Sequence, residues 1–508
     1  MKRLLYIFLS LLPAGLAAQN MYETAPLMQN DLTGTSRYMS MAGSMGALGG
    51  DVSVMGSNPA GTALYRTSDF SFTGSMAFNN VKATYNDYTV KSNDVRFDVE
   101  NFGAVLVNKV NNGGFMKYFN MGIGYRRKNG LASEFSVEGP SWGFSQQYAI
   151  RELYDNRQFR LDHVDYKSFE NFTYSWLPLL ATYANIGDTD GNLITRPDGS
   201  LIFEPTDIEF RSEERGGTSE VDFNFATNIS DRFYFGATLS LVNVDYSINT
   251  LYYEIDDLGD IYSIGNYTRI DGEGYNLKLG AILRPFQYSP FKIGVAVHTP
   301  TWYRLNNCSY ADIEGPFGDY YDTRSSEIYN ACLETKSKFN SPWRFMASAS
   351  YTFGTFMALN VDYEYTDYST AKYKFVSAGS YKAQNEEIKY NLKEQHTIRI
   401  GAEVNLGDGI ALRGGYYYSS APFRTDAYKE MLNMPVTATA TDYNNRFSKE
   451  AVTLGGGYRG QIFYFDMAYV FDTQKSDFYP YYDPEEPNPA ARMEYSNHTI
   501  TATLGMRF

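Results

Sequence analysis

Strict alternation of apolar and polar residues constrains this chain more than any other feature. In residues 69–78 the apolar side chains share one parity, namely Phe70, Phe72, Met76 and Phe78. The residues between them are small or polar, and comparable segments recur as far as the C-terminal Phe508. A period of two is that of a β-strand with one apolar face. Segments of about ten residues are long enough to cross a membrane as tilted strands.

The connections between these segments alternate between short and long. Short turns are predicted near 110–117, 229–232, 285–290, 353–356, 405–410 and 458–461. Long loops are predicted near 80–99, 139–216, 249–266, 305–337, 369–391, 420–446 and 473–494. Transmembrane barrels have short turns at one end and long loops at the other. With strands also predicted near 100–110 and 117–138, the sequence predicts an all-β fold, a transmembrane antiparallel β-barrel of about 14 strands. A soluble sandwich or propeller would not sort its loops by length.

Composition agrees with a membrane barrel once the alternation is considered. The mean hydropathy of −0.39 resembles that of a water-soluble protein, yet 16% of the residues are aromatic. Only every second wall residue must be apolar, so the average conceals a lipid-facing surface. The net charge of −14 argues against nucleic acid as a partner. The expected surroundings are therefore lipid.

The N-terminus has the features of an exported protein. Lys2 and Arg3 precede a short apolar stretch, and Ala17 and Ala18 supply small residues for cleavage. We therefore predict a signal peptide over 1–18 and a location in the cell outer membrane of a Gram-negative bacterium. A membrane anchor, the alternative, would need a longer apolar helix. The C-terminal alternating strand that ends at Phe508 is typical of sequences recognised by the barrel-assembly machinery.

The residues that alternate with the apolar ones are expected to face the lumen, and many of them are charged. The cations that could hold a substrate carboxylate there are Lys278, Arg344, Arg399 and Arg413. Carboxylates such as Asp362 and Glu403 lie on neighbouring predicted strands, so cross-strand ion pairs are the preferred alternative. In that case the cations hold the wall together.

Residues 19–66 precede the first wall strand and are too rich in Gly, Ala and Met to belong to it. Asn58 favours a turn and Pro59 fixes its own φ, so the pair predicts a rigid corner. Small neighbours, among them Ala60, would let this corner press against the wall. We predict that 19–66 fold back as a plug inside a barrel formed by 67–508.

Four features resemble the FadL/OmpP1/TodX family of outer-membrane transporters for hydrophobic compounds. "SMGALGGDVSVMGSNPAGTALY" is similar to the family's hatch, with Asn58, Pro59 and Ala60 as its motif. "NGLASEF", from Asn129 to Phe135, is similar to its kinked third strand. "GAILRPFQYSPFKIGVAVHTPTWY" is similar to its Gly- and Pro-containing hairpin, and the strand count matches fourteen.

The resemblance implies passive uptake of long-chain fatty acids or other apolar molecules. In this family a hatch closes the lumen and the substrate leaves sideways where the third strand kinks, here at Asn129 and Gly130. A side exit returns an apolar solute to hydrocarbon instead of to water. A turn glycine at the outer end of the strand is the alternative reading of Gly130.

The outer loops are the expected place of substrate capture. The resemblance assigns this role to about 249–266 and 305–337, and the Cys308–Cys332 pair would stiffen the second of these. The unusually long loop 139–216 offers an apolar set that could capture substrate or pack as a cap: Trp176, Leu177, Leu179 and Leu180.

Two other classes of function compete with uptake. Some barrels of this type act as structural or shuttle subunits of a protein-secretion apparatus, and large acidic loops would suit a partner surface. An outer-membrane hydrolase would need a nucleophile beside a positioned histidine. No such arrangement is evident around His298. The two cysteines and four histidines show no metal-ligand spacing, so we expect no enzyme activity, metal or cofactor.

Overall fold

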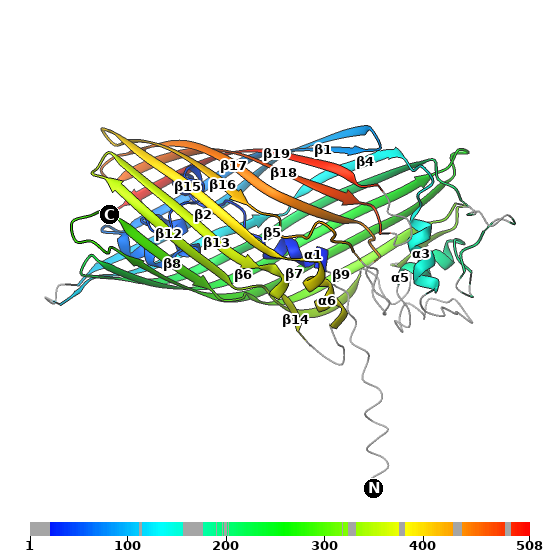
Figure 1. Cartoon of the computed structure of the whole chain (residues 1–508), viewed down its shortest axis with the longest axis horizontal. Coiled ribbons are helices and arrows are strands. Elements are labelled where there is room, and N and C mark those ends of the chain that lie inside the picture. The colour runs from blue at the N-terminus through cyan, green and yellow to red at the C-terminus, as the bar shows by residue number, and fades with distance from the viewer. Residues whose placement is uncertain are drawn as a thin grey trace, which may run out of the picture.

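The chain forms a closed antiparallel barrel around its own N-terminal segment (Figure 1). The computed structural model describes residues 21–110, 114–155, 176–188, 190, 192–195, 197, 201, 203–316, 318–323, 332–374, 382–429, 439–482 and 489–508. Fourteen strands make the wall, and β1 (Asp69–Tyr85) closes it by pairing with β19 (Ala491–Arg507). The predicted fold class is confirmed.

Several wall strands are built from two segments that pair with the same neighbour. Besides β1 and β19, the unbroken ones are β2 (Tyr88–Lys109), β5 (Asp207–Ile229), β6 (Phe233–Ile255), β7 (Ile261–Leu283), β15 (Glu394–Gly407), β16 (Ile410–Ser419), β17 (Tyr443–Arg459) and β18 (Phe463–Tyr479). The divided ones are β3 (Met116–Gly130) with β4 (Ser133–Pro140), β8 (Lys292–His298) with β9 (Trp302–Glu314), β12 (Arg344–Phe353) with β11 (Leu333–Asn340), and β13 (Met357–Asp367) with β14 (Lys372–Lys374). A short β10 (Tyr320–Asp322) extends the hairpin of β9.

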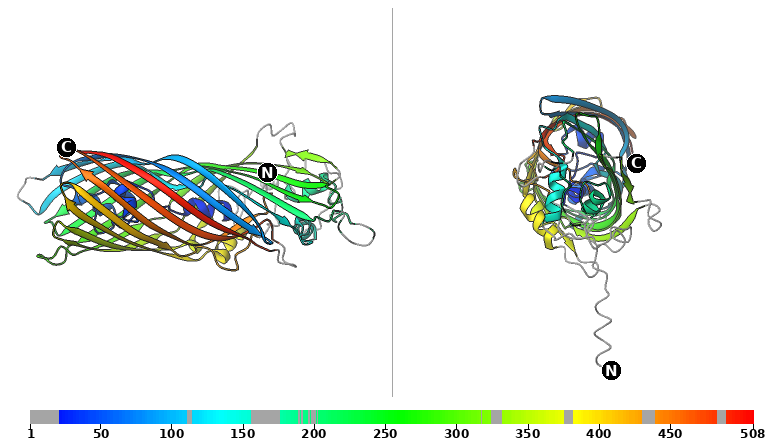
Figure 2. Two further views of the ribbon diagram at one scale, coloured as in Figure 1. Left: turned by 90° about the horizontal axis from the view of Figure 1, so that it is seen from above. Right: turned by 90° about the vertical axis from the view of Figure 1, so that its right-hand side faces the viewer.

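Residues 21–66, here called the inner segment, lie within the barrel in every view (Figure 2). The segment contains α1 (Met21–Met28), α2 (Ser36–Ser40), η1 (Val52–Gly56) and η2 (Pro59–Leu64). Tyr22 of α1 stacks on Phe423 at a centroid distance of 5.5 Å, on the side of the lumen near α6 (Lys382–Asn391). The 3-10 helices lie nearer the short turns, so the inner segment runs along much of the bore.

An apolar belt surrounds the part of the wall nearest the short turns. Exposed large residues alternate with buried ones, as in the β6 series Phe233, Phe235, Leu239 and Leu241. The charged residues of the opposite parity point inward; Asp222, Lys278 and Asp362 are each at most 3% exposed. A wall that is apolar outside and polar inside is the surface of a barrel in lipid. Among the described residues, no helix is long and apolar enough to cross a membrane.

The wall continues well beyond this belt, where the predicted loops 80–99 and 249–266 prove wrong. The predicted loop 305–337 is also strand at both ends, because β9 continues to Glu314 and β11 begins at Leu333. Residues 80–99 form the ends of β1 and β2, joined by a tight turn in which Asn86 and Asp87 have φ of 45° and 69°. Residues 249–266 are wall as well, because β6 and β7 pair as far as Ile255 and Ile261. The strands β5, β6 and β7 each have 23 residues, about twice what a tilted strand needs to cross a membrane.

The connection between β4 and β5 covers 141–206, a shorter stretch than the predicted 139–216. Its described parts include α3 (Gln146–Asp155) and α5 (Trp176–Tyr183), which lie at the outer end of the barrel (Figure 1). Their apolar side chains join a large buried cluster with residues from β1, β5, β9 and β18. We call this assembly the cap.

Candidate functional site

The Asn-Pro-Ala corner packs against the inside of the wall at positions occupied by glycine. Asn58 caps η2 by accepting from the amide of Ala60 at 3.2 Å and donates to the Gly46 carbonyl at 2.7 Å. A β-carbon on Gly280 would lie 2.0 Å from the Asn58 side-chain oxygen, and one on Gly236 would lie 2.4 Å from the Pro59 carbonyl. The corner can therefore approach the wall only because these wall positions lack side chains.

Ion pairs and hydrogen bonds attach the rest of the inner segment to the wall. Arg37 pairs with Glu403 at 2.8 Å, and Glu403 in turn pairs with Arg413 at 2.6 Å. The amide of Gly46 donates to Asp362 at 3.0 Å. The Ser57 carbonyl contacts His298 Nε2 at 2.6 Å. These buried polar contacts make the inner segment part of the fold of the barrel.

All four predicted lumen cations are paired. Lys278 lies 2.7 Å from Glu220 and 3.2 Å from Asp222, while Arg413 lies 2.5 Å from Asp466. Arg399 and Arg344 share Glu364, at 3.0 and 3.5 Å. Each of these side chains therefore already has a carboxylate partner, as the wall-bracing interpretation expects.

The third wall strand is interrupted where the sequence predicts a kink. Within residues 88–140, of which the structure describes all but 111–113, the β2–β3 ladder ends at the pair Asn101 and Arg126. Beyond it, β4 pairs with β5 but has no ladder with β2. Register shifts in β2 near Glu100 and in β3 after Arg127 accompany the break. A gap in the hydrogen-bonded wall results.

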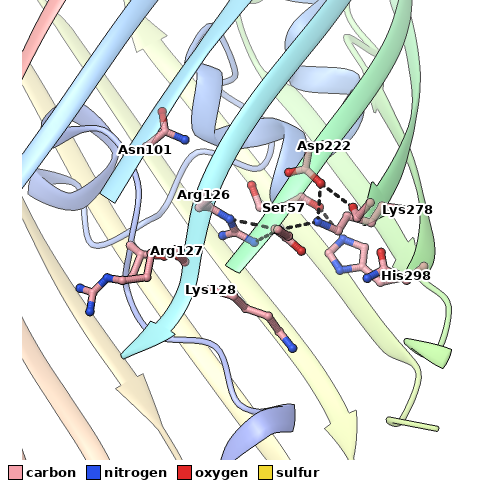
Figure 3. A network of polar contacts seen from close by, with 12 residues as sticks. Ser57, Asn101, Arg126, Arg127, Lys128, Asp222, Lys278 and His298 are labelled. Carbon is pink, nitrogen blue, oxygen red and sulfur yellow. Dashed lines mark hydrogen bonds and ion pairs between the residues drawn. The ribbon is translucent and has the colours of Figure 1, made fainter. Parts of the chain in front are cut away.

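Side chains fill this gap in the present conformation. Arg127 pairs with Glu100 at 2.5 Å and with Asp98 at 3.2 Å, across the unpaired edges. Arg126 and Lys128 extend from the other side of β3 (Figure 3). Arg126 joins the network of Glu220 and Lys278, and Lys128 Nζ donates to the Leu27 carbonyl at 3.1 Å.

The inner segment is bonded directly to the interrupted strand. Asn129 donates to the carbonyls of Pro26 and Gln29 at 2.8 and 3.1 Å. The Gly130 amide donates to Asp31 at 3.1 Å. Burial would raise the pKa of Asp31, but Lys449, the Gly130 amide and Arg127 lower it, and the resulting pKa is below its ordinary value. The ionised Asp31 therefore ties the inner segment to the kink.

Two lumen cavities share two lining residues, Gln29 and Arg446, and the sequence analysis singled out neither of them. The upper cavity, about 90 Å³, lies inside the barrel, between α1 and buried wall residues near its outer end such as Phe135 and Phe478. The kink cavity, about 150 Å³, borders Asn129 and Gly130. Arg446 lines both cavities. Its guanidinium lies 6.0 Å from the ring centroid of Tyr495, and it forms no ion pair with any described residue.

The four loop residues predicted for capture are fully buried in the cap. Trp176, Leu177, Leu179 and Leu180 are at most 1% exposed. They pack on α3 and the outer wall, so they form the interior of a cap. The predicted disulfide is present, with Cys308 of β9 bonded to Cys332 just before β11.

Comparison with known proteins relates this architecture to solved transporters. No model of a protein family and no curated protein matches the chain. A Pseudomonas aeruginosa FadL homologue is 12% identical, covers 94% of this chain and 99% of its own, and superposes with a TM-score of 0.54. The Pseudomonas putida toluene transporter TodX gives 12% identity, 94% and 99% coverage and a TM-score of 0.52.

The Ralstonia pickettii toluene transporter TbuX is 15% identical, with 94% and 99% coverage and a TM-score of 0.50. These similarities extend over nearly the whole of this chain and nearly the whole of each solved structure. The chain therefore has the fold of the FadL-type transporters of hydrophobic compounds.

Proposed function

We propose that this protein is an outer-membrane transporter that takes up hydrophobic small molecules passively, with long-chain fatty acids as the leading substrate class. Solved proteins of the same fold include toluene transporters, which supports an apolar cargo. The observation that carries the proposal is the end of the β2–β3 ladder beside the kink cavity. A solute there would reach the lipid without entering water.

The route would lead from the cap through the upper cavity to the kink cavity and out through the wall gap. Neither cavity, at about 90 and 150 Å³, holds a long-chain acid whole, since ligand pockets usually measure about 300 Å³ or more. Transport therefore requires the inner segment and the cap to move. The proposal gives the inner segment the role of a hatch and includes no catalytic step or cofactor.

Arg446 is our candidate for the group that receives a substrate carboxylate. It faces both cavities and forms no ion pair with a described carboxylate, in contrast to Lys278, Arg344, Arg399 and Arg413. Glu214, which lines the upper cavity, and Asp31 attract it without forming an ion pair. A charge-assisted hydrogen bond would orient the acid head while its tail stays in apolar surroundings.

Uptake of labelled oleate into proteoliposomes tests the exit route. A β-carbon on Gly130 would lie 2.1 Å from the Arg127 guanidinium and 3.7 Å from that of Arg96, so Gly130→Val crowds the gap. We expect uptake to fall about tenfold. The control Gly414→Val adds the same side chain on β16, where the nearest atom to the new β-carbon is 3.5 Å away. Equal uptake by both variants and the wild type would exclude exit at the kink.

A role in protein secretion is the second candidate. The 23-residue strands β5, β6 and β7 extend beyond the apolar belt and, with the cap, offer a large surface for a protein partner. Stoichiometric recovery of one secreted protein with the purified barrel, together with uptake no faster than in protein-free liposomes, would favour this role over transport.

A further inference from the structure

Three cations stand on the outer wall directly above the apolar belt. Tyr275 and Trp302 face each other at a ring distance of 5.2 Å at the edge of the belt. Arg304 is the next residue of that parity on β9. On β11 Lys338 lies opposite Arg304, and Lys336 lies opposite Asn306, one step further from the belt. Aromatic pairs of this kind mark the membrane interface. These exposed cations therefore lie about 7–14 Å further along the strands, at the height of lipid headgroups.

The register places two of these cations against each other. Lys338 lies between Arg304 of β9 and Lys374 of β14, an arrangement that destabilises a sheet because the charges are alike. On its other side Arg304 lies opposite Glu273 of β7. Among the described residues, none forms an ion pair or hydrogen bond with the side chains of Arg304, Lys336 or Lys338. On the adjoining strands, by contrast, Arg269 pairs with Asp245 at 3.0 Å. An anion from outside the chain would relieve the repulsion.

The wall is hollowed beside these cations. The hollow, about 760 Å³, lies between β6, β7, β9 and β11 and has Arg304, Lys336 and Lys338 on one side. Asp245, Asp271 and Glu273 line the other side, where Arg269 pairs with Asp245 and Asn306 donates to Asp271 at 3.2 Å. Cations on one side suit a phosphate, while carboxylates on the other accept hydrogen bonds from sugar hydroxyls. The chemistry of both sides matches a phosphorylated sugar better than a simple anion, which the carboxylates would repel.

We propose that this hollow binds the phosphorylated sugar headgroup of an anionic glycolipid in the outer leaflet. The proposal rests on the proposed outer-membrane location and is separate from the transport route. The phosphate lies between Arg304 and Lys338, with Lys336 beside it. The acyl chains run down the apolar belt past Tyr275 and Trp302. The site anchors the barrel to the lipid around it and fixes the height at which it sits.

Native mass spectrometry of the full mature protein in neutral detergent tests this site, with diphosphorylated lipid A as the probe. The variant R304Q/K336Q/K338Q should bind it at least about tenfold more weakly than the wild type. The control R211Q/R215Q/K382Q removes the same charge from exposed positions elsewhere and should bind as the wild type does. The dephosphorylated lipid should bind the wild type at least about tenfold more weakly.

Stability measurements separate binding from misfolding. In lipid-free detergent Lys338→Gln should unfold at the same temperature as the wild type or higher, since the repulsion with Arg304 is removed. With lipid A present, the wild type should become the more stable of the two.

Equal lipid A binding by the triple variant and the wild type would overturn the proposal. So would an equal loss in the control, or displacement of the lipid by millimolar inorganic phosphate, which would assign the site to a free anion. A failure of oleate uptake alone leaves these outcomes unaffected.

Discussion

Single glycines decide how closely the inner segment fits the wall. Gly236, Gly280 and Gly294 lie on the three successive strands β6, β7 and β8, beneath the Asn58–Pro59 corner. Sequence analysis singled out Gly280 and Gly294 only as parts of a hairpin similar to that of the FadL family. Their physical role is visible once the register brings them beneath the corner.

Replacement of Gly280 by valine should displace the inner segment without unfolding the barrel. The new β-carbon would lie 2.0 Å from the Asn58 side chain and 3.0 Å from the Ala60 amide, both fully buried. The lipid-facing residues of β7 are untouched, so the heat-modifiable electrophoretic mobility of a folded barrel should persist. Limited proteolysis should cleave within residues 21–66 several times faster than in the wild type. Gly414→Val serves as the control, and equal cleavage rates in the two variants would contradict the proposed close fit.

Arg446→Gln should weaken binding of a fatty acid but not of the matching alcohol. The guanidinium faces both cavities, and a charge-assisted hydrogen bond contributes about 1.5–3 kcal/mol, or roughly tenfold or more in affinity. Titration of oleate and oleyl alcohol by intrinsic fluorescence measures both affinities. A similar loss for acid and alcohol would show that Arg446 shapes the cavity and does not receive the carboxylate.

At the scale of elements, the strands continue beyond the segments in which apolar residues alternate on the lipid-facing side. Val81 and Ala83 of β1 face inward, while Asn80 and Lys82 face outward, where water rather than lipid surrounds the wall. From Val81 onward the apolar side chains lie on the opposite parity, so the lipid-facing alternation ends although the backbone pairing continues. The sequence therefore predicted loops at 80–99 and 249–266, because the signal depends on lipid at one face and not on the β-ladder itself.

The disulfide should stabilise the outer extension without being needed for the membrane belt. It joins β9 to the start of β11 across a sequence separation of 24 residues, for which loop entropy predicts about 3 kcal/mol. The double variant C308S/C332S should unfold at a lower denaturant concentration and still insert into liposomes. Oleate uptake should stay within about twofold of the wild type. Complete loss of folding would show that these outer strands pair before the belt forms.

At the scale of the whole molecule, the barrel is closed by its own chain at two levels. The buried inner segment lies inside the barrel, and the helices α3 and α5 of the cap lie at its outer end (Figure 2). The apolar side chains of α5 are buried in the cap. The described wall lacks a ladder between the outer part of β2 and β4. The proposed lateral route for apolar solutes rests on these features together.

The sequence predicted the architecture of the barrel better than it predicted the residues that line its cavities. Alternation and loop lengths determine the strand number, and the parity of residues such as Lys278 and Asp362 correctly placed them inside. Arg446 could not be recognised because it fell in a predicted loop and because a register shift follows it in β17, before Lys449. Pairing partners of lumen charges depend on barrel register, which no local pattern contains.

The electrical conductance of the purified mature protein in planar bilayers tests the central claim most directly. Wild-type barrels should insert and carry almost no steady ionic current, whereas barrels that lack residues 20–64 should open a stable pore. A wild-type protein that conducts ions steadily, like a general porin, would contradict a bore closed by its own N-terminal segment.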